Sequence, residues 1–434
     1  MSVIPESDLT ERRPLTRGDA KTLLLAALGG ALEFYDFVIF AYFAKTLGHL
    51  FFPPGTSDWL AQLQAFGIFA VGYLARPIGG LVMAHFGDRV GRKRMFTLSV
   101  FLMAVPTLLI GALPTYGTIG VFAPVLLTLL RIVQGIAIGG EVPGAWVFVA
   151  EHVPRHRIGL ACASLSCGLT VGILIGSLVA AAMNAYLSEA AMLAYGWRIA
   201  FVLGGVFGFF AVYLRRWLSE TPVFTRLRER KQLTTELPAW VVLRDHLPGV
   251  ALSMVVTWVL TAAIVVVILM TPTLMQTAFH VAPDRAFASG SLAAFALCVG
   301  CLLGGLLVDW QGKARAMLVA SIGLGVSTYA LYVDLKSGGA LLFALYPLAG
   351  LFAGVAGIVP SVLVASFPAA IRFSGISLSY NVAYAICGAA TPVVVGYLAK
   401  TAGGLGPAHY VALVSLVGVA SAIYMLRSRR WFGA

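Results

Sequence analysis

Twelve long apolar stretches recur along this chain, and they restrict its fold more than any other feature. A transmembrane helix needs about 20 consecutive apolar residues, and helices satisfy their own backbone hydrogen bonds inside lipid. The 434 residues are 59% hydrophobic and 11% charged, whereas a soluble domain carries roughly 25% charged residues. We therefore predict an all-α membrane protein with twelve transmembrane helices, at residues 23–52, 59–84, 95–114, 119–150, 157–187, 197–218, 247–279, 287–308, 315–335, 340–366, 371–400 and 408–427.

An extended polar segment separates the sixth apolar stretch from the seventh. A partial repeat supports a division at this segment, because the stretch from Gly79 to Met95 is echoed from Gly304 to Met317, with Asp309 in the place of Asp88. We predict two pseudo-symmetric six-helix bundles, residues 23–218 and 247–427, with a cytoplasmic linker at 219–246 and cytoplasmic tails at 1–22 and 428–434.

The net charge of +12 raises the question of a nucleic-acid partner. Most of the 30 Lys and Arg residues, however, fall in segments that a twelve-helix arrangement places on one side of the bilayer, including both tails and the central linker. Cytoplasmic loops of membrane proteins carry such an excess of basic residues. We predict a multi-pass protein of the cell inner membrane with both termini in the cytoplasm, in contact with lipid and without a nucleic-acid partner.

The five cysteines lie inside the apolar stretches, where we expect them to be small packing residues: Cys162, Cys167, Cys298, Cys301 and Cys387. Cys298 and Cys301 have C-x-x-C spacing, but no nearby His or second Cys pair completes a metal-binding set. The sequence also contains no Gly-Lys-Ser phosphate loop and no Ser-His arrangement within the spans. We therefore predict no metal, no cofactor and no enzymatic or ATP-driven activity.

Three acidic residues lie well inside predicted spans, away from the span ends, where a charge costs at least ~2.5–3.5 kcal/mol and tends to face a cavity or a partner. Glu33 and Asp36 are three residues apart on one face of the first span, near its middle. Two carboxylates this close disfavour ionisation of both, so one can hold a proton at neutral pH. We predict proton coupling by Asp36, Glu33 and Glu141. The alternatives are permanent pairing with an arginine for the first two, and a bridge between helices for Glu141.

Two arginines lie well inside predicted spans, away from the span ends: Arg131 in the fourth and Arg76 in the second. Because a guanidinium binds a carboxylate through two parallel hydrogen bonds, Arg131 is the first candidate for binding an anionic substrate, together with Gln134. Alternatively, Arg131 is the buried partner of Asp36 or Glu33, and both arrangements could occur in sequence. Arg76 is a further candidate, for which we favour a structural role.

The second half has no ionisable residue near its span centres and offers neutral polar side chains instead. Tyr380 and Tyr384, in the eleventh span, share a helix face through their i, i+4 spacing. We predict that Asn381 and one of these tyrosines hydrogen-bond the substrate. The alternative for each aromatic side chain is packing, or anchoring at the membrane interface.

The charged segment His85–Arg94 lies between the second and third spans, and we expect a short loop that turns at Gly87 and Gly91. An acid beside an arginine or at a helix N-terminus contributes ~0.3–1 kcal/mol at exposed sites. Such contacts can hold one conformation of two bundles that rock against each other. We predict this gating role for Asp88, Arg89, Arg92, Asp309, Glu151, Arg157 and Arg372. The alternative for the basic residues is that they only set the topology.

Local motifs along almost the whole chain resemble the major facilitator superfamily, and its metabolite:proton symporter family in particular. Besides the doubled Gly-Asp-Gly-basic segment, they are Glu33–Phe37, Arg76–Gly79, His85–Lys93, Arg131–Gly135, Gly139–Glu141, Gly196–Ile199, Glu220–Phe224, Arg372–Gly375, Ser377, Tyr380–Asn381 and Thr391–Pro392. The chain departs from the family pattern at Ala84, Ile158, Ala200 and Ala365. Ile158 and Ala365 replace an arginine and an acid, which thins the expected network of gating charges.

The fifth span has glycine at every fourth position, at Gly168, Gly172 and Gly176. This spacing lets another helix approach closely. No proline interrupts the stretch, as it would in the antiporter motif of drug exporters, which favours uptake over export.

The resemblance implies a proton-coupled secondary active importer that works by alternating access, as a monomer, on a small-molecule substrate. Within the family we favour the organic-acid uptake branch, with a di- or tricarboxylate such as citrate or 2-oxoglutarate, because the intramembrane Arg131 suits an anion. A shikimate-like acid is one alternative. A betaine or proline-type solute is another, which Glu33, Asp36 and an aromatic cluster would suit better. From a different class, a membrane metabolite sensor remains, although no extended soluble segment is present to carry a signal.

Overall fold

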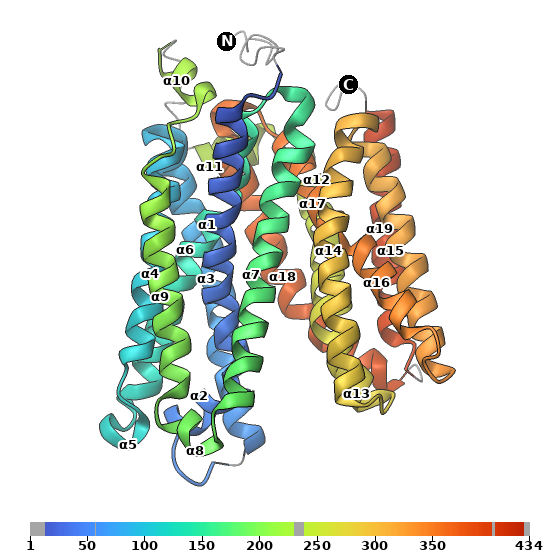
Figure 1. Ribbon diagram of the computed structural model, residues 1–434. Helices are drawn as coiled ribbons and strands as arrows, with labels where there is room; N and C mark the ends of the chain where they lie inside the picture. Colours follow the sequence, from blue (N-terminus) through green and yellow to red (C-terminus); the bar gives the residue numbers. More distant parts are fainter. Residues whose placement is uncertain (1–13, 57, 230–237, 402–403, 429–434) are drawn as a thin grey trace. The chain divides into compact units, whose positions relative to one another are not determined.

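A computed structural model describes residues 14–56, 58–229, 238–401 and 404–428 (Figure 1). The long helices are α1 (Arg17–Tyr42), α3 (Asp58–Val90), α4 (Arg92–Ala112), α6 (Phe122–His152), α7 (Ile158–Tyr186), α9 (Trp197–Arg215), α12 (Leu247–Ala262), α14 (Pro283–Gln311), α15 (Lys313–Lys336), α16 (Leu342–Ala353), α17 (Val355–Ala365), α18 (Arg372–Thr401) and α19 (Gly406–Arg427). The short ones are α2 (Ala44–Phe51), α5 (Tyr116–Ile119), α8 (Glu189–Ala191), α10 (Pro222–Glu229), α11 (Pro238–Asp245) and α13 (Thr271–Ala278).

The described residues contain 11 helical stretches that are long and apolar enough to cross a membrane. Some of these stretches combine several elements. For example, α12 continues through a π-helical segment, Ala263–Met270, into α13, and α16 is followed by α17 after Gly354. α3, with 33 residues, is a further long helix. The prediction of an all-α membrane protein is confirmed, and the predicted number of twelve spans is consistent with this count.

The charged segment between the second and third spans is helical over most of its length, so the prediction of a loop at His85–Arg94 was wrong. α3 continues through Asp88 to Val90, and α4 begins at Arg92. Only Gly91 separates them, with a φ of 134°, a value that side chains with a Cβ rarely adopt. Asp88 pairs with Arg92 at i, i+4, and α3 continues through Gly87 without interruption. Asp88 therefore lies in a helical turn, which orients its side chain.

The chain divides into two compact units. The N-terminal unit comprises Leu24–Ala145 and Gly168–Glu220, and the C-terminal unit comprises the residues up to Leu23, Trp146–Cys167 and Thr221 onward. Helices α6 and α7 therefore contribute residues to both units. The six-helix halves and the cytoplasmic linker stay predictions.

Glycines set the packing inside the N-terminal unit. A Cβ on Gly168 of α7 would lie 2.4 Å from the carbonyl oxygen of Ala27 in α1, and one on Gly172 would lie 2.2 Å from that of Ala31. The predicted close approach of another helix to the glycines of span five is thus confirmed at two positions. Figure 1 also shows α4 and α9 side by side in this unit, as their many contacts require.

Glycines also allow close helix packing inside the C-terminal unit. Gly300 of α14 lies against the backbone of α16, because a Cβ there would be 2.0 Å from the carbonyl oxygen of Leu351. Likewise, a Cβ on Gly350 of α16 would lie 2.3 Å from the carbonyl oxygen of Ala293 in α14. Helices α15 and α19 form a second closely packed pair, visible in Figure 1. Backbone contacts of this kind hold membrane helices together through dispersion, since lipid offers no hydrophobic driving force.

Candidate functional site

A chain of buried polar side chains crosses the core of the N-terminal unit. The guanidinium of Arg131, in α6, donates a hydrogen bond of 2.8 Å to Oε1 of Gln134, whose Nε2 donates one of 2.7 Å to Oγ1 of Thr107 in α4. The guanidinium carbon of Arg131 also lies 4.5 Å from the ring centroid of Phe40 in α1. All three polar residues are at most 1% exposed. The protein itself thus holds Arg131, through an amide oxygen and a ring face.

Asp36 is buried at the other end of this chain. It is 0% exposed, and its carboxylate lies next to the Thr107 side chain. Gly204 and Gly208 of α9 make room for it, since a Cβ on Gly204 would be 2.3 Å from Oδ1 of Asp36. Among the described residues, neither carboxylate oxygen of Asp36 has a partner with good hydrogen-bond geometry. Burying a carboxylate in this way is costly unless it is paired or carries a proton.

The other two acids predicted for proton coupling differ from Asp36. The side chain of Glu33, one turn earlier in α1, lies outside the described residues. Glu141, in α6, has its Oε1 3.9 Å from Nη2 of Arg215 in α9. Arg215 is itself held by the carbonyl oxygen and the ring of Phe96. Glu141 therefore connects two helices, which was the alternative to a role in proton transfer.

Arg76 lies in α3 at the contact with α6. A Cβ on Gly139 of α6 would be 2.2 Å from the carbonyl oxygen of Arg76. The Arg76 guanidinium carbon is 5.6 Å from the ring centroid of Tyr73, and the residue is 2% exposed. This position suits the structural role that the sequence favours.

Three aromatic rings gather in the C-terminal unit. The rings of Trp146, from the end of α6, and Tyr380, from α18, meet edge to face with centroids 5.0 Å apart. The rings of Tyr380 and Tyr384 lie 5.3 Å apart, as their i, i+4 spacing predicts. We call Trp146, Tyr380 and Tyr384 the aromatic group. Asn381, between the two tyrosines, donates a hydrogen bond of 2.9 Å to the carbonyl oxygen of Ser377.

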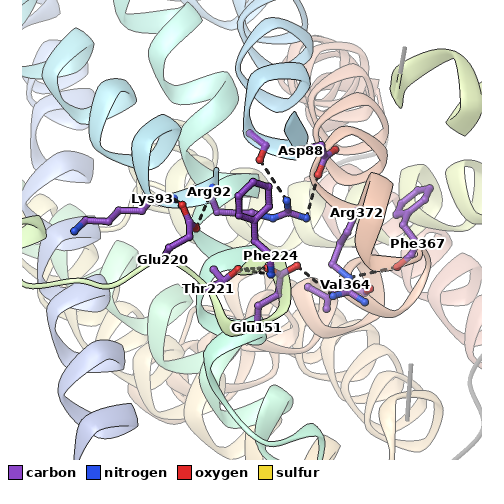
Figure 2. A network of polar contacts seen from close by, with 11 residues as sticks. Asp88, Arg92, Lys93, Glu151, Glu220, Thr221, Phe224, Val364, Phe367 and Arg372 are labelled. Atoms are coloured by element: carbon purple, nitrogen blue, oxygen red, sulfur yellow. Dashed lines mark hydrogen bonds and ion pairs between the residues drawn. The ribbon is translucent and has the colours of Figure 1, made fainter. Parts of the chain in front are cut away.

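The gating residues predicted in the N-terminal unit surround the start of α4 (Figure 2). Nη2 of Arg92 lies 3.3 Å from Oδ1 of Asp88, and both side chains are fully buried. The backbone N–H groups of Arg92 and Lys93 donate hydrogen bonds of 3.1 and 3.2 Å to Oε1 of Glu220. Glu220 therefore caps the N-terminus of α4, where a negative charge is favourable. Arg89 is exposed.

A second polar group, in the C-terminal unit, joins the end of α6 to the start of α18 (Figure 2). Oε1 of Glu151 lies 3.4 Å from Nη1 of Arg372. Thr221 donates a hydrogen bond of 2.6 Å to Oε2 of the same carboxylate. Arg372 also donates to the backbone carbonyl oxygens of Val364 and Phe367. Two predicted gating residues are thus brought into contact, with Thr221 as an additional partner.

Asp309 binds the N-terminus of α7, which begins at Ile158. Its carboxylate accepts hydrogen bonds of 2.8 and 3.2 Å from the backbone N–H groups of Gly159 and Leu160. The contact with a helix N-terminus that we predicted for Asp88 is therefore made by its counterpart in the repeat. Arg157 lies in a short 3₁₀ turn just before α7 and lines a groove with Asp309, together with His156, Leu303, Leu306, Leu307 and Trp310.

Four residues that connect these groups were not predicted as site residues from the sequence: Thr107, Arg215, Glu220 and Thr221. Glu220 and Thr221 lie in one of the stretches that resemble the family, which was a usable signal. Trp146 was also missed, because one aromatic residue in an apolar span looks like packing. Arg215 ends a span next to a basic neighbour and looks like a topology determinant.

Residues 23–392 match the family model described as Major Facilitator Superfamily. The chain is 30% identical over 428 residues to the "Glycine betaine/proline/ectoine/pipecolic acid transporter OusA" of Dickeya dadantii, covering 93% of this chain and 83% of that protein. It is also 30% identical over 426 residues to the "Proline/betaine transporter" of Escherichia coli K12, with the same coverage. A "Putative proline/betaine transporter" of Staphylococcus aureus (strain COL) is 30% identical over 401 residues, 92% of this chain and 86% of that protein.

Solved structures share the fold at lower identity. The proton:xylose symporter XylE bound to 6-bromo-6-deoxy-D-glucose is similar with a TM-score of 0.78 and 19% identity, over 94% of this chain and 95% of that one. The human organic anion transporter MFSD10 is similar with a TM-score of 0.70 and 16% identity, over 94% and 100% of the two chains.

These relatives contradict the predicted substrate. The expectation of a di- or tricarboxylate importer of the organic-acid branch was wrong, because the similar sequences are named as proline and betaine transporters. The error came from Arg131, which suggested an anionic substrate. In the structure, its guanidinium is engaged by Gln134 and Phe40 inside the protein, so its presence in a span does not indicate the charge of the substrate. By its motifs, its fold and these matches, the chain belongs to the major facilitator superfamily of multi-pass membrane transporters and is not an enzyme.

Proposed function

We propose that this protein is a symporter that imports betaine or proline-type solutes together with protons, by alternating access. We place it in the bacterial inner membrane as a monomer, with both termini in the cytoplasm. The names of the relatives support this class of substrate, which the sequence left as an alternative.

The aromatic group is the observation that carries the proposal. Betaines and proline pair a carboxylate with an alkylated ammonium group, which is bulky and weakly hydrated. Such cations bind to the faces of Trp and Tyr rings, with a gain of about 0.5–2 kcal/mol per contact. Trp146 and Tyr380 are buried and Tyr384 is half-buried, so the rings offer a largely dry environment. A di- or tricarboxylate would gain nothing from ring faces of negative potential.

The buried carboxylate of Asp36 supports proton coupling. It is fully buried, and no described cation forms an ion pair with it, although Arg131 lies at the other end of the Gln134–Thr107 chain. In our proposal Asp36 binds the coupled proton, and the polar chain responds to its change of charge by shifting hydrogen bonds. Glu141 then has the structural role of bridging α6 and α9.

Uptake by purified protein in liposomes tests the substrate. With an imposed inward proton gradient, labelled glycine betaine and proline should accumulate, and citrate and 2-oxoglutarate should not. Trp146→Leu should strongly weaken betaine uptake by raising KM, whereas the exposed Trp217→Leu should leave it unchanged. Equal uptake by Trp146→Leu and wild type would remove the aromatic group from the substrate site.

A second measurement tests the proton. Asp36→Asn removes the titratable group but keeps the shape, so gradient-driven accumulation should be lost while exchange of internal for external betaine persists. Asp245→Asn, at an exposed position outside the predicted spans, is the matched control and should behave as wild type. Accumulation by Asp36→Asn at the wild-type level would exclude Asp36 as the proton carrier.

A further inference from the structure

Two thiols join α7 to α14 in the C-terminal unit, and the proposed transport chemistry does not use them. The side chains of Cys298, in α14, and Cys167, in α7, lie close enough to interact. Cys298 is 9% exposed, and Cys167 is only half-buried. Cys301, one turn from Cys298, is fully buried. Cys167 is therefore the more accessible thiol of the pair.

The packing of the two helices explains why the thiols meet. A Cβ on Gly305 of α14 would lie 2.3 Å from the Cβ of Ala163 in α7, and one on Gly159 would lie 2.5 Å from the carbonyl oxygen of Gly305. The backbones are thus in direct contact. The two helices are antiparallel, so residue numbers rise along α7 while those of its contacts on α14 fall. The pairs in contact are Gly159 with Asp309, Ala163 with Gly305, and Cys167 with Cys298. The antiparallel register and the absence of side chains at both glycines bring the two sulfur atoms together.

We propose that Cys167 and Cys298 form an oxidation site that closes to a disulfide when a hydroperoxide reaches it. The sulfur of Cys167 attacks one peroxide oxygen, the O–O bond breaks, and a sulfenic acid and one water form. The sulfur of Cys298 then attacks the Cys167 sulfur, the S–O bond breaks, and a second water leaves with the thiol proton. Overall the two thiols lose two electrons and two protons, and hydrogen peroxide is reduced to two waters.

The position of Cys167 gives the disulfide a consequence for transport. Residues 158–167 of α7 belong to the C-terminal unit, whereas Gly168 and the residues after it belong to the N-terminal unit. Because α7 continues from one unit into the other directly after Cys167, a covalent bond from Cys167 to α14 fixes the position of α7 at this junction. Because alternating access requires one bundle to move against the other, oxidation should arrest the cycle. This consequence rests on the proposed transport function, whereas formation of the disulfide does not.

The test oxidises the full-length protein in liposomes with hydrogen peroxide and measures disulfides and uptake in parallel. Peptide mapping by mass spectrometry should find a Cys167–Cys298 disulfide. Uptake of labelled glycine betaine should lose most of its initial rate and recover after dithiothreitol. Cys167→Ser and Cys298→Ser should each keep uptake and resist peroxide, and Cys387→Ser, with a half-buried thiol in α18, should respond like wild type.

Several results would overturn the proposal. Cys167 and Cys298 recovered as free thiols after oxidation, or Cys167 paired with Cys301 instead, would refute the site. Peroxide inhibition that persists in both serine variants would show that another group causes the arrest. If the protein transports neither betaine nor proline, the proposed function fails, and the oxidation site is still decided by the peptide mapping alone.

Discussion

The two repeated charged segments, Gly79–Met95 and Gly304–Met317, share a sequence pattern but make different contacts. Both turn at a glycine with positive φ, 134° at Gly91 and 87° at Gly312. In the first segment the acid, Asp88, forms a buried ion pair with Arg92 of the same segment. In the second, Asp309 accepts hydrogen bonds from the N-terminus of a distant helix, α7.

The two segments therefore share a backbone turn and the position of an acidic residue. The residues that surround each acid determine which group it binds. In the first segment Arg92 is fully buried and Glu220 caps α4. In the second, Lys313 takes the place of Arg92, and the close approach of Gly159 to α14 brings free N–H groups to Asp309. One pattern thus supports an ion pair in one half and a helix cap in the other. The four predictions below test this contrast.

The largest effect is expected for the ion pair. Asp88→Asn leaves the Arg92 guanidinium buried without its carboxylate, which typically costs about 3–5 kcal/mol. Thermal unfolding of the purified protein in detergent should show a clear drop in Tm. Asp245→Asn, which removes an exposed ion pair with Arg244, is the control and should cost about 0–1 kcal/mol. If Asp88→Asn lowers the unfolding free energy no more than Asp245→Asn does, the buried ion pair does not distinguish the first segment from the second.

The second effect concerns the turns that the two segments share. Gly91→Ala and Gly312→Ala force a Cβ into a backbone region that is essentially restricted to glycine, at a cost of order 1–3 kcal/mol each. A Cβ at Gly312 meets no atom within 4 Å, so strain alone should account for its loss. If both variants lower the unfolding free energy by similar amounts, backbone strain at the glycine explains the loss in both segments. A neutral Gly312→Ala would contradict the positive φ.

The third effect concerns the cap. Asp309→Ala removes the acceptor for the Gly159 and Leu160 N–H groups, and lost caps cost about 0.5–2 kcal/mol. Asp309→Asn keeps an oxygen acceptor and should lose less, so the two variants should rank in that order in denaturant unfolding. The same order in hydrogen exchange at the start of α7 would locate the effect. If Asn is as harmful as Ala, the charge of Asp309 matters more than its hydrogen bonds.

The smallest effect is expected at Glu220. Glu220→Gln keeps an oxygen that accepts from the Arg92 and Lys93 N–H groups and removes only the negative charge at the helix N-terminus. The loss should be about 0.3–1 kcal/mol and should shrink at high salt. Glu220→Ala, which also removes the acceptor, should cost more. A larger loss for Gln than for Ala would mean that Glu220 does not act as a cap.

Sequence reasoning succeeded where the signal is local. The spans follow from hydropathy, the turns at Gly91 and Gly312 from the repeated glycines, and the shared face of Tyr380 and Tyr384 from helical spacing. It failed where a residue's partner is remote. Arg131 suggested an anionic substrate because the sequence does not show that its guanidinium contacts Gln134 and Phe40 within the protein.

The sequence by itself determined that this protein is helical, spans a membrane and belongs to the major facilitator superfamily, because hydropathy and short motifs are properties of single continuous stretches of the chain. Only the tertiary structure decided that Asp36 is buried without an ion-pair partner among the described residues, that Trp146 joins the tyrosines of α18, and that Cys167 meets Cys298. Each of these features depends on how helices distant in the sequence pack together. At Asp36 and at Cys167, glycines of α9, α7 and α14 allow the close packing.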